Sequence, residues 1–224
     1  MSFVGGGSDL PAFYRQHGGA VISTAIDKYV YVTVNKKFDD WIRVSYSKTE
    51  EVKNVSELDH RIVRAALQKL DISGGVEITS VADIPSRGTG LGSSSSFTVG
   101  LLHALSAFQG RSMPAGELAE ESCSVEIDYC GERIGKQDQY AAAYGGFNMI
   151  RFNPDDSVIL EPIICRKNLV QELQSSIVSF YTGLTRSASG ILANQSRQME
   201  EDHHSQKSML RMVQLAHHMR DELH

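Results

Sequence analysis

The stretch that decides the fold is Pro85-Ser-Arg-Gly-Thr-Gly-Leu-Gly-Ser-Ser-Ser-Ser-Phe97, a glycine-rich turn that leads directly into an apolar, helix-forming segment. Its three glycines allow the backbone to curl and to approach a ligand closely, because glycine has no Cβ. The four serines at 93–96 then start a helix, where free amide groups and the helix dipole favour an anion. Their hydroxyl groups can bind phosphate oxygens or join the shell of a Mg²⁺ ion. The sequence therefore predicts a cradle for the phosphates of a nucleotide.

This loop differs from the two best-known phosphate loops. A Walker A loop carries a lysine after its last glycine, and none is present here. The G-x-G-x-G spacing also misses the Rossmann G-x-G-x-x-G, and no acidic ribose partner follows at the usual distance. A flexible Gly/Ser linker is the alternative interpretation. A linker would be followed by polar sequence, whereas the helical apolar face here consists of Phe97, Val99, Leu101, Leu102, Ala104, Leu105 and Phe108.

Composition excludes several classes of protein. The chain has 224 residues, enough for one large domain or two small ones. Its 22 basic and 27 acidic residues give a formal charge of −5, so no general basic footprint for nucleic acid exists. We expect no membrane span and no signal peptide. Cys123, Cys130 and Cys165 lack a zinc or redox spacing, which predicts a reduced, cytoplasmic protein. The sequence leaves the oligomeric state open.

The order of the expected elements predicts an α+β protein with two lobes. Strands are expected at 21–26, 29–34, 41–46 and 75–82, and a helix at 59–70. Helices at 91–108, 115–130 and 135–144 follow, then a hairpin at 147–164 that turns at Asn153-Pro-Asp-Asp156. A strand at 176–181 and helices at 187–201 and 204–223 finish the chain. Residues 168–175 are the expected boundary between domains at 1–167 and 176–224.

The loop resembles the second signature motif of the GHMP kinases, the family of galactokinase, homoserine kinase, mevalonate kinase and phosphomevalonate kinase. That motif reads P-x-x-x-G-L-G-S-S-[SA], and residues 85–95 keep its core. The resemblance implies a ribosomal-protein-S5-domain-2-like N-terminal lobe and a ferredoxin-like C-terminal lobe, here incomplete. It also implies ATP and Mg²⁺ as cofactors. The residues implied for ATP are Pro85, Arg87, Gly88, Gly90, Leu91, Gly92, Ser93, Ser94, Ser95 and Ser96.

Two carboxylates follow the loop. The family places a Mg²⁺-ligand glutamate opposite the loop serines, and Ser-Val-Glu126-Ile-Asp128 resembles that site, with Ser94 as the hydroxyl ligand. Glu120 and Glu121 are weaker candidates. The segment Gly135-Lys-Gln-Asp138-Gln139-Tyr140 resembles the family's G-x-x-D-Q segment, which implies that Asp138 accepts or orients the proton of the substrate hydroxyl. Without the resemblance, a helical Glu would be read as solvated or ion-paired, and an Asp at a helix start as a cap.

The N-terminal segment Ser2-Phe-Val-Gly-Gly-Gly-Ser-Asp9-Leu-Pro11 resembles the family's first motif. Gly5 and Asp9 keep the register, and Gly6 and Gly7 replace a Glu-His pair. The glycines would bring backbone N–H groups to sugar hydroxyls, and Asp9 would accept a hydrogen bond from one of them. A tight turn with a helix cap at Ser8 is the alternative interpretation.

This glycine-rich start and the segments at 19–31 and 180–189 resemble one branch of the family, the D-glycero-D-manno-heptose 7-phosphate kinases. The branch implies phosphorylation of the anomeric hydroxyl of a sugar that already carries a phosphate. Thr185, Arg186 and Ser187, at an expected strand-to-helix junction, would bind that phosphate; a helix cap beside a surface arginine is the alternative. Two other functions stay open: a fucokinase-like enzyme acting on an unphosphorylated sugar, and a nonenzymatic nucleotide- or sugar-binding remnant.

The chain is shorter than the family pattern. The third motif, G-x-G-G-G-G, would lie beyond His224, and the arginine of the first motif would precede Ser2. We therefore expect a member truncated at both ends. The C-terminal histidines lack a metal-binding spacing and are expected on a polar helix surface; they are His203, His204, His217, His218 and His224.

Overall fold

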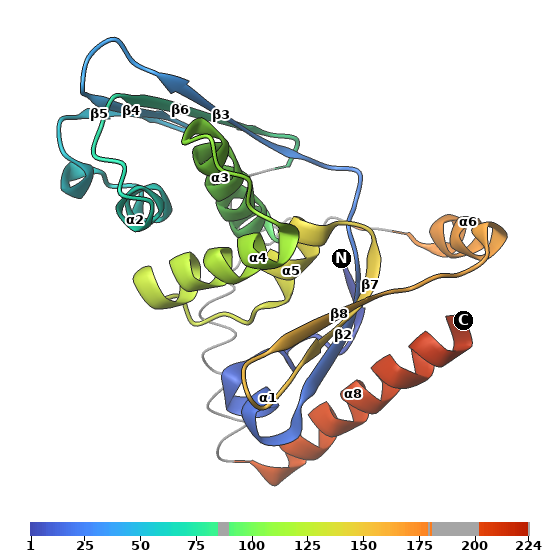
Figure 1. Ribbon diagram of the computed structural model, residues 1–224. Helices are drawn as coiled ribbons and strands as arrows, with labels where there is room; N and C mark the ends of the chain where they lie inside the picture. The colour runs from blue at the N-terminus through green and yellow to red at the C-terminus, as the bar shows by residue number, and fades with distance from the viewer. Residues whose placement is uncertain (85–89, 179, 181–201, 224) are drawn as a thin grey trace. The chain divides into compact units, whose positions relative to one another are not determined.

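The computed structural model describes residues 1–84, 90–178, 180 and 202–223. The chain divides into two compact units, residues 26–145 and residues 1–25 with 146–224 (Figure 1). Helices and strands are mixed along it, which confirms the α+β prediction. Among the described helices, none combines the length and the apolarity that a membrane crossing needs.

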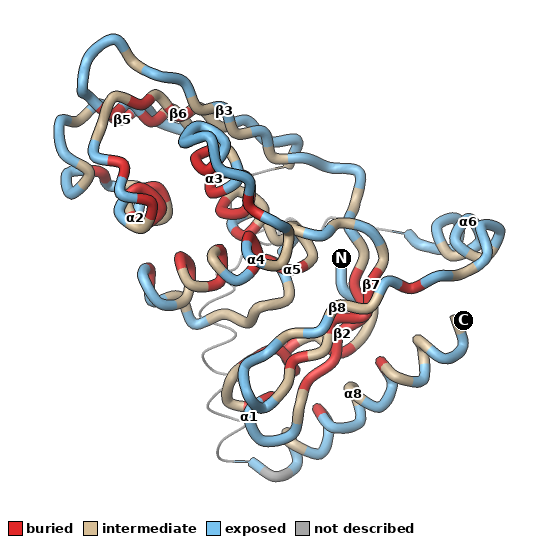
Figure 2. The backbone as a smooth tube through the Cα atoms, viewed as in Figure 1, coloured by how far each residue is buried: buried red, intermediate tan, exposed pale blue. Residues whose placement is uncertain are grey.

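Residues 26–145 are built on a sheet with the strand order β3-β6-β4-β5. Its strands are β3 (Val30–Lys36), β4 (Ile42–Ser45), β5 (Thr49–Val52) and β6 (Val76–Ala82). β6 pairs antiparallel with β3 and parallel with β4, so the chain crosses over between β5 and β6. Along β3 the side chains alternate: Val32 and Val34 pack on the core, and Tyr31 and Thr33 are exposed (Figure 2).

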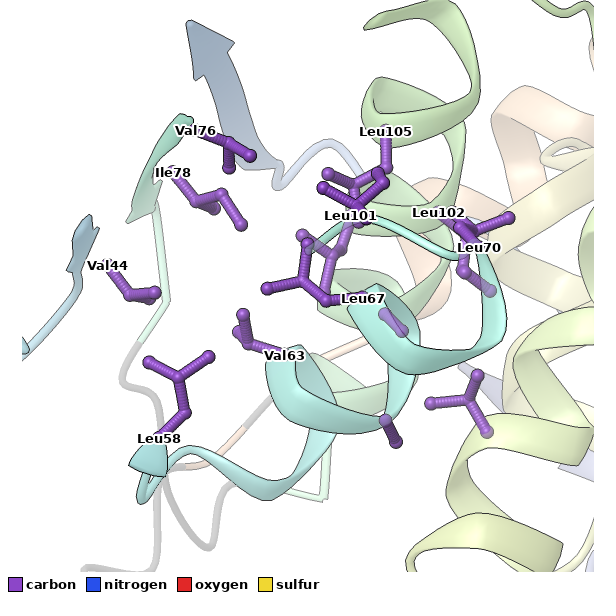
Figure 3. Close-up of a cluster of buried hydrophobic side chains, with 14 of the residues drawn as sticks. Val44, Leu58, Val63, Leu67, Leu70, Val76, Ile78, Leu101, Leu102 and Leu105 are labelled. Carbon is purple, nitrogen blue, oxygen red and sulfur yellow. The ribbon is translucent and has the colours of Figure 1, made fainter. Parts of the chain in front are cut away.

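The helices of this unit lie on one side of the sheet, and the helix Ser93–Phe108 packs directly against β3 (Figure 1). They are η1 (Val55–Glu57), α2 (Arg61–Lys69), α3 (Ser93–Phe108), α4 (Ala115–Cys123), the π-helix η2 (Ser124–Tyr129) and α5 (Gln137–Tyr144). Buried aliphatic side chains fill the space between the sheet, α2 and α3 (Figure 3); they include Val44, Leu58, Val63, Leu67, Leu70, Val76, Ile78, Leu101, Leu102 and Leu105. This core fixes α3 and therefore the direction in which its serine-rich start points.

The helix expected at 115–130 is present, but its last turns are wider than those of an α-helix. After Cys123 the α-helix continues as a π-helix, in which the N–H of Cys130 donates to the carbonyl of Val125 at 3.0 Å, five residues earlier. Helix α2 contacts both ends of this segment. The Lys69 ammonium lies 3.0 Å from Ser124 Oγ at its start, and the Arg61 guanidinium donates to the Cys130 carbonyl at its end. π-Turns of this kind occur frequently at functional sites.

The other unit contains a sheet with the order β1-β2-β7-β8. Its strands are β1 (Ser2–Val4), β2 (Gly19–Thr24), β7 (Phe147–Phe152) and β8 (Val158–Pro162), and its helices are α1 (Pro11–His17), α6 (Lys167–Ser176) and α8 (His203–Leu223). The hairpin expected at 147–164 is confirmed. Helix α8 packs Met209 against Leu10 and Phe13, and Ala216 against Ile22.

Three expectations for the C-terminal part have different outcomes. The strand expected at 176–181 is wrong where it is described, because Ser176 ends α6 and residues 177 and 178 belong to no strand. The helix expected at 187–201 lies outside the described residues. The boundary expected at 168–175 falls within α6, and the domains at 1–167 and 176–224 remain a prediction.

The core under α3 provides a test of the fold. Leu101 is fully buried, whereas His103 is exposed on the same helix. We expect Leu101→Ala to lower the free energy of unfolding by about 2–5 kcal/mol, because it removes packed methyl groups and leaves a cavity. The matched variant His103→Ala should change it by less than about 0.5 kcal/mol. Urea unfolding followed by circular dichroism measures both, and equal effects of the two variants would contradict the assigned core.

Candidate phosphate-binding and catalytic site

The described part of the loop ends in a left-handed turn at the start of α3. Gly90 and Gly92 have φ angles of 67° and 66°. Gly92 is the N-cap, and its carbonyl accepts the first hydrogen bond of the helix, from Ser96 N–H at 2.9 Å. The amides of the three preceding serines therefore have no partner within the helix. Since the N-cap residue is a glycine and supplies no side-chain cap, the start of α3 can receive an anion.

Next to this helix start lies the buried carboxylate of Glu126, which is 1% exposed. Three side chains donate hydrogen bonds to it. Ser94 Oγ lies 2.5 Å from Glu126 Oε1, and Ser95 Oγ lies 2.8 Å from Oε2. Gln139 Nε2, from α5, lies 2.6 Å from the same Oε2. The carboxylate thus joins the starts of two helices to the π-helix that carries it.

Burial shapes the electrostatics of this carboxylate. The pKa of Glu126 is held above its ordinary value of 4.5, chiefly because burial disfavours the charged form. The hydrogen bonds from Ser94, Ser95 and Gln139 act in the opposite direction, and the negative charge of Asp138 adds to the increase. A buried carboxyl group with a raised pKa beside an anion-binding helix start is typical of a functional site.

Asp138 lies on the loop side of the same cluster. It is exposed and belongs to the first turn of α5. A Cβ placed on Gly92 would come within 3.2 Å of its Cγ, so the carboxyl group lies directly against the loop backbone. The N-cap of α5 is Lys136 rather than Asp138. Asp138, Glu126 and the serines, which are far apart in the sequence, therefore come together at one end of α3.

The donor set suits a hard divalent cation such as Mg²⁺, which prefers oxygen ligands. Glu126 Oε1 and the hydroxyl of Ser94, an exposed residue in the first turn of α3, are two such oxygens. The weaker candidates have other environments: Glu120 is exposed, and Glu121 pairs with Lys69 at 2.8 Å. Across the described residues, no group of three or more His, Cys, Asp or Glu side chains forms a ready metal site. A cation here would rely on one carboxylate, a hydroxyl, phosphate oxygens and water.

The glycine-rich turn at residues 5–9 belongs to the unit formed by residues 1–25 and 146–224. Gly5 has a φ of 91°, and a Cβ there would lie 1.9 Å from the Ala20 carbonyl oxygen, so only glycine fits. Asp9 is buried and accepts a hydrogen bond from Gly7 N–H at 3.1 Å. Ser8 Oγ accepts from Ala20 N–H at 3.1 Å and donates to the Ala20 carbonyl at 3.2 Å. The side chains of Ser8 and Asp9 thus hold the turn, and the role of this segment in sugar binding remains a prediction.

Several expected site residues cannot be placed. Pro85, Arg87 and Gly88 of the loop, and Thr185, Arg186 and Ser187, lie outside the described residues. Gln139 is the residue that the sequence reasoning left out of the site. Its signal was its position directly after Asp138, but the partner of its side chain becomes visible only in the folded chain.

Comparisons with known proteins agree with this geometry. Residues 57–146 match the family described as GHMP kinases N terminal domain. The chain is 30% identical over 207 residues to D-glycero-alpha-D-manno-heptose 7-phosphate kinase of Campylobacter jejuni, covering 85% of this chain and 60% of that protein. It is 27% identical to the L-fucokinase/L-fucose-1-P guanylyltransferase of Bacteroides fragilis, covering 86% of this chain and 24% of that protein.

A solved structure gives the same result for the fold. The crystal structure of a D-glycero-D-manno-heptose 1-phosphate kinase from Bacteroides thetaiotaomicron superposes with a TM-score of 0.76 at 25% identity, covering 94% of this chain and 72% of that one. By contrast, the chain spans less than two thirds of the length of the Campylobacter jejuni and Bacteroides fragilis relatives. The loop, the buried glutamate and the neighbouring aspartate all lie within residues 57–146, and this part of the chain belongs to the GHMP kinase N-terminal domain family.

Proposed function

We propose that this chain is an ATP-dependent, Mg²⁺-requiring GHMP sugar kinase that phosphorylates the anomeric hydroxyl of D-glycero-D-manno-heptose 7-phosphate. The observation that carries the proposal is the cluster at the start of α3: a buried carboxylate bonded to two loop serines, with a second carboxylate against the loop backbone. Phosphoryl transfer needs a phosphate cradle, a cation site and a group that receives the proton of the nucleophile, and the groups of this cluster support assigning these three tasks to it.

Each residue has a distinct task in this proposal. The free amides of residues 93–95 and the loop backbone bind the phosphates of ATP. Glu126 and Ser94 would hold Mg²⁺, which when bound neutralises charge that develops on the phosphate oxygens. The oxygen of the sugar hydroxyl attacks the γ-phosphorus of ATP, and ADP leaves. Asp138 accepts the proton that this hydroxyl loses. Its exposure on the loop side of the cluster is compatible with contact to a substrate.

The choice of substrate rests on the named relatives and on two segments of this chain. The Campylobacter jejuni relative is named for heptose 7-phosphate, whereas the Bacteroides thetaiotaomicron protein of known structure is named as a heptose 1-phosphate kinase. The glycine turn at Gly5, Gly6 and Gly7 and the segment at Thr185, Arg186 and Ser187 are proposed for the sugar and its distal phosphate. The likeness to the Bacteroides fragilis fucokinase keeps a second candidate, a kinase for an unphosphorylated sugar.

The role of Asp138 can be tested by replacing its carboxyl group with the amide of asparagine. We expect Asp138→Asn to lower kcat by about 10²–10⁴-fold, because the amide cannot accept the proton, and to leave the affinity for ATP almost unchanged. The matched variant Asp128→Asn changes an exposed carboxylate on η2 and should keep wild-type turnover. ADP release under saturating substrate measures both; normal turnover of Asp138→Asn would remove Asp138 from the role of base.

The ionisation of Glu126 has a consequence for stability. Because the folded chain raises its pKa above 4.5, the folded state binds this proton more tightly than the unfolded state does. The free energy of unfolding should therefore fall as the pH rises from 4.5 through the raised value. A glutamine at 126 keeps three partners, since its oxygen accepts from Ser95 and Gln139 and its amide can donate to Ser94.

We therefore expect Glu126→Gln to be more stable than the wild type at neutral pH and to lose this advantage below pH 4.5. The same variant should lose Mg²⁺-dependent turnover, because the amide no longer offers a charged ligand. Urea unfolding of both proteins across this pH range provides the measurement. Parallel pH profiles of the two proteins would show that Glu126 does not titrate as its burial demands.

Substrate choice can be tested with a small panel. We expect ADP release with D-glycero-D-manno-heptose 7-phosphate and not with L-fucose, galactose or mevalonate. Arg186→Ala should raise KM for the phosphosugar at least tenfold, because a charge-assisted bond to its phosphate would be lost, and should leave turnover of a neutral sugar unaffected. Turnover of L-fucose alone would favour the second candidate. Binding of Mg²⁺-ATP without turnover of any sugar would favour a nonenzymatic nucleotide-binding protein.

A further inference from the structure

We propose that Gln139 is a positioning residue that orients the Glu126 carboxylate so that Oε1 is presented to a divalent cation. The inference rests on the proposed function, because it takes Glu126 as the cation ligand. It goes further in assigning a role to a buried amide that touches neither the nucleotide nor the sugar in that proposal.

The two oxygens of Glu126 have different surroundings. Oε2 accepts hydrogen bonds from Gln139 Nε2 at 2.6 Å and from Ser95 Oγ at 2.8 Å, and both donors are buried. Oε1 accepts one bond, from the exposed Ser94. Two buried donors therefore hold Oε2, whereas the partner of Oε1 among the described residues is the exposed Ser94, in the first turn of the helix whose start would bind phosphates.

The orientation of the Gln139 amide is fixed by the carboxylate. The opposite orientation would bring Gln139 Oε1 to 2.6 Å from Glu126 Oε2, two acceptors facing one another. In the observed orientation Gln139 Oε1 is buried and has no hydrogen-bond partner among the described residues. An amide that is only half satisfied costs stability in a core. A residue selected for packing alone would be apolar here, so the hydrogen bond to Glu126 explains its presence.

The position of Gln139 also links the two carboxylates of the site. Gln139 follows Asp138 in the first turn of α5, so consecutive side chains of one helix face Glu126 and the loop glycine Gly92. The bond to Glu126 fixes the rotation of this short helix. Loss of the bond would therefore disturb both the cation ligand and, to a smaller extent, the proposed base.

The ionised form of Glu126 is stabilised by hydrogen bonds from uncharged side chains. From α3 it faces the hydroxyls of Ser94 and Ser95, and from α5 the Gln139 amide and the carboxylate of Asp138. Burial raises the pKa of the Cys130 thiol, just past η2, and the charges of Glu132 and Glu126 add to the increase. The Asp138 charge opposes ionisation of Glu126, and the hydrogen bond from Gln139 favours it.

The test uses Gln139→Met, which keeps an unbranched side chain of similar length and removes the donor. We expect the affinity for Mn²⁺, measured by electron paramagnetic resonance in the presence of ADP, to fall by about 10–100-fold. The pH midpoint of the Glu126 carboxyl carbon in ¹³C NMR should move upward. The matched variant Gln68→Met changes an exposed glutamine on α2 and should alter neither quantity. Unchanged Mn²⁺ affinity and an unchanged Glu126 midpoint in folded Gln139→Met would overturn the proposal.

Two further measurements keep the test decisive. If Gln139→Met does not fold, Gln139→Asn replaces it, because the shorter amide cannot reach Glu126 and should show the same losses. In the unaltered chain, the side-chain amide signals of Gln139 should change with the same pH midpoint as the Glu126 carboxyl; independent midpoints would contradict the proposal. Since these titrations need no sugar and no turnover, they separate failure of this inference from failure of the kinase assignment.

Discussion

The helices that form the candidate site in residues 26–145 meet at one buried side chain, Glu126. Removing an ionised carboxyl group from water is costly unless hydrogen bonds compensate for the lost solvent. Glu126 obtains three of them, two from the start of α3 and one from α5. The two serines of α3 and the glutamine of α5 must therefore be placed so that all three reach the same carboxyl group. Hydrogen bonds to a single side chain thus link the starts of α3 and α5 to the π-helix η2.

A second layer of contacts keeps Glu126 in place. The leucines of α3 and α2 form the core under the sheet, and α2 contacts both ends of the π-helix through Lys69 and Arg61. Widening of the helix in its last turns changes the direction in which residue 126 points relative to a regular α-helix. The same helix α2 thus supports the hydrophobic core on one side and the geometry of the carboxylate on the other.

The sequence was most informative where the chemistry is local. A run of glycines and serines before an apolar helix predicts an anion-binding turn without knowledge of the rest of the fold, and the start of α3 confirms the helix at Ser93. The π-helix after Cys123 could not be predicted, because it is held by side chains of α2 that lie more than fifty residues earlier. The strand expected at 176–181 failed for a related reason: a short apolar run is compatible with several conformations, and its surroundings decide among them.

Gly92 meets two separate structural demands, one from its own backbone conformation and one from a neighbouring side chain. Its φ of 66° alone would admit Asn or Asp, which tolerate the left-handed region better than other residues do. A Cβ at this position, however, would come within 3.2 Å of Asp138 Cγ. The turn thus favours glycine, and the carboxylate that lies against it adds a second reason for glycine. A side chain here would crowd the group proposed to receive the proton of the substrate, so the loop motif and Asp138, 46 residues later, are parts of one geometric constraint.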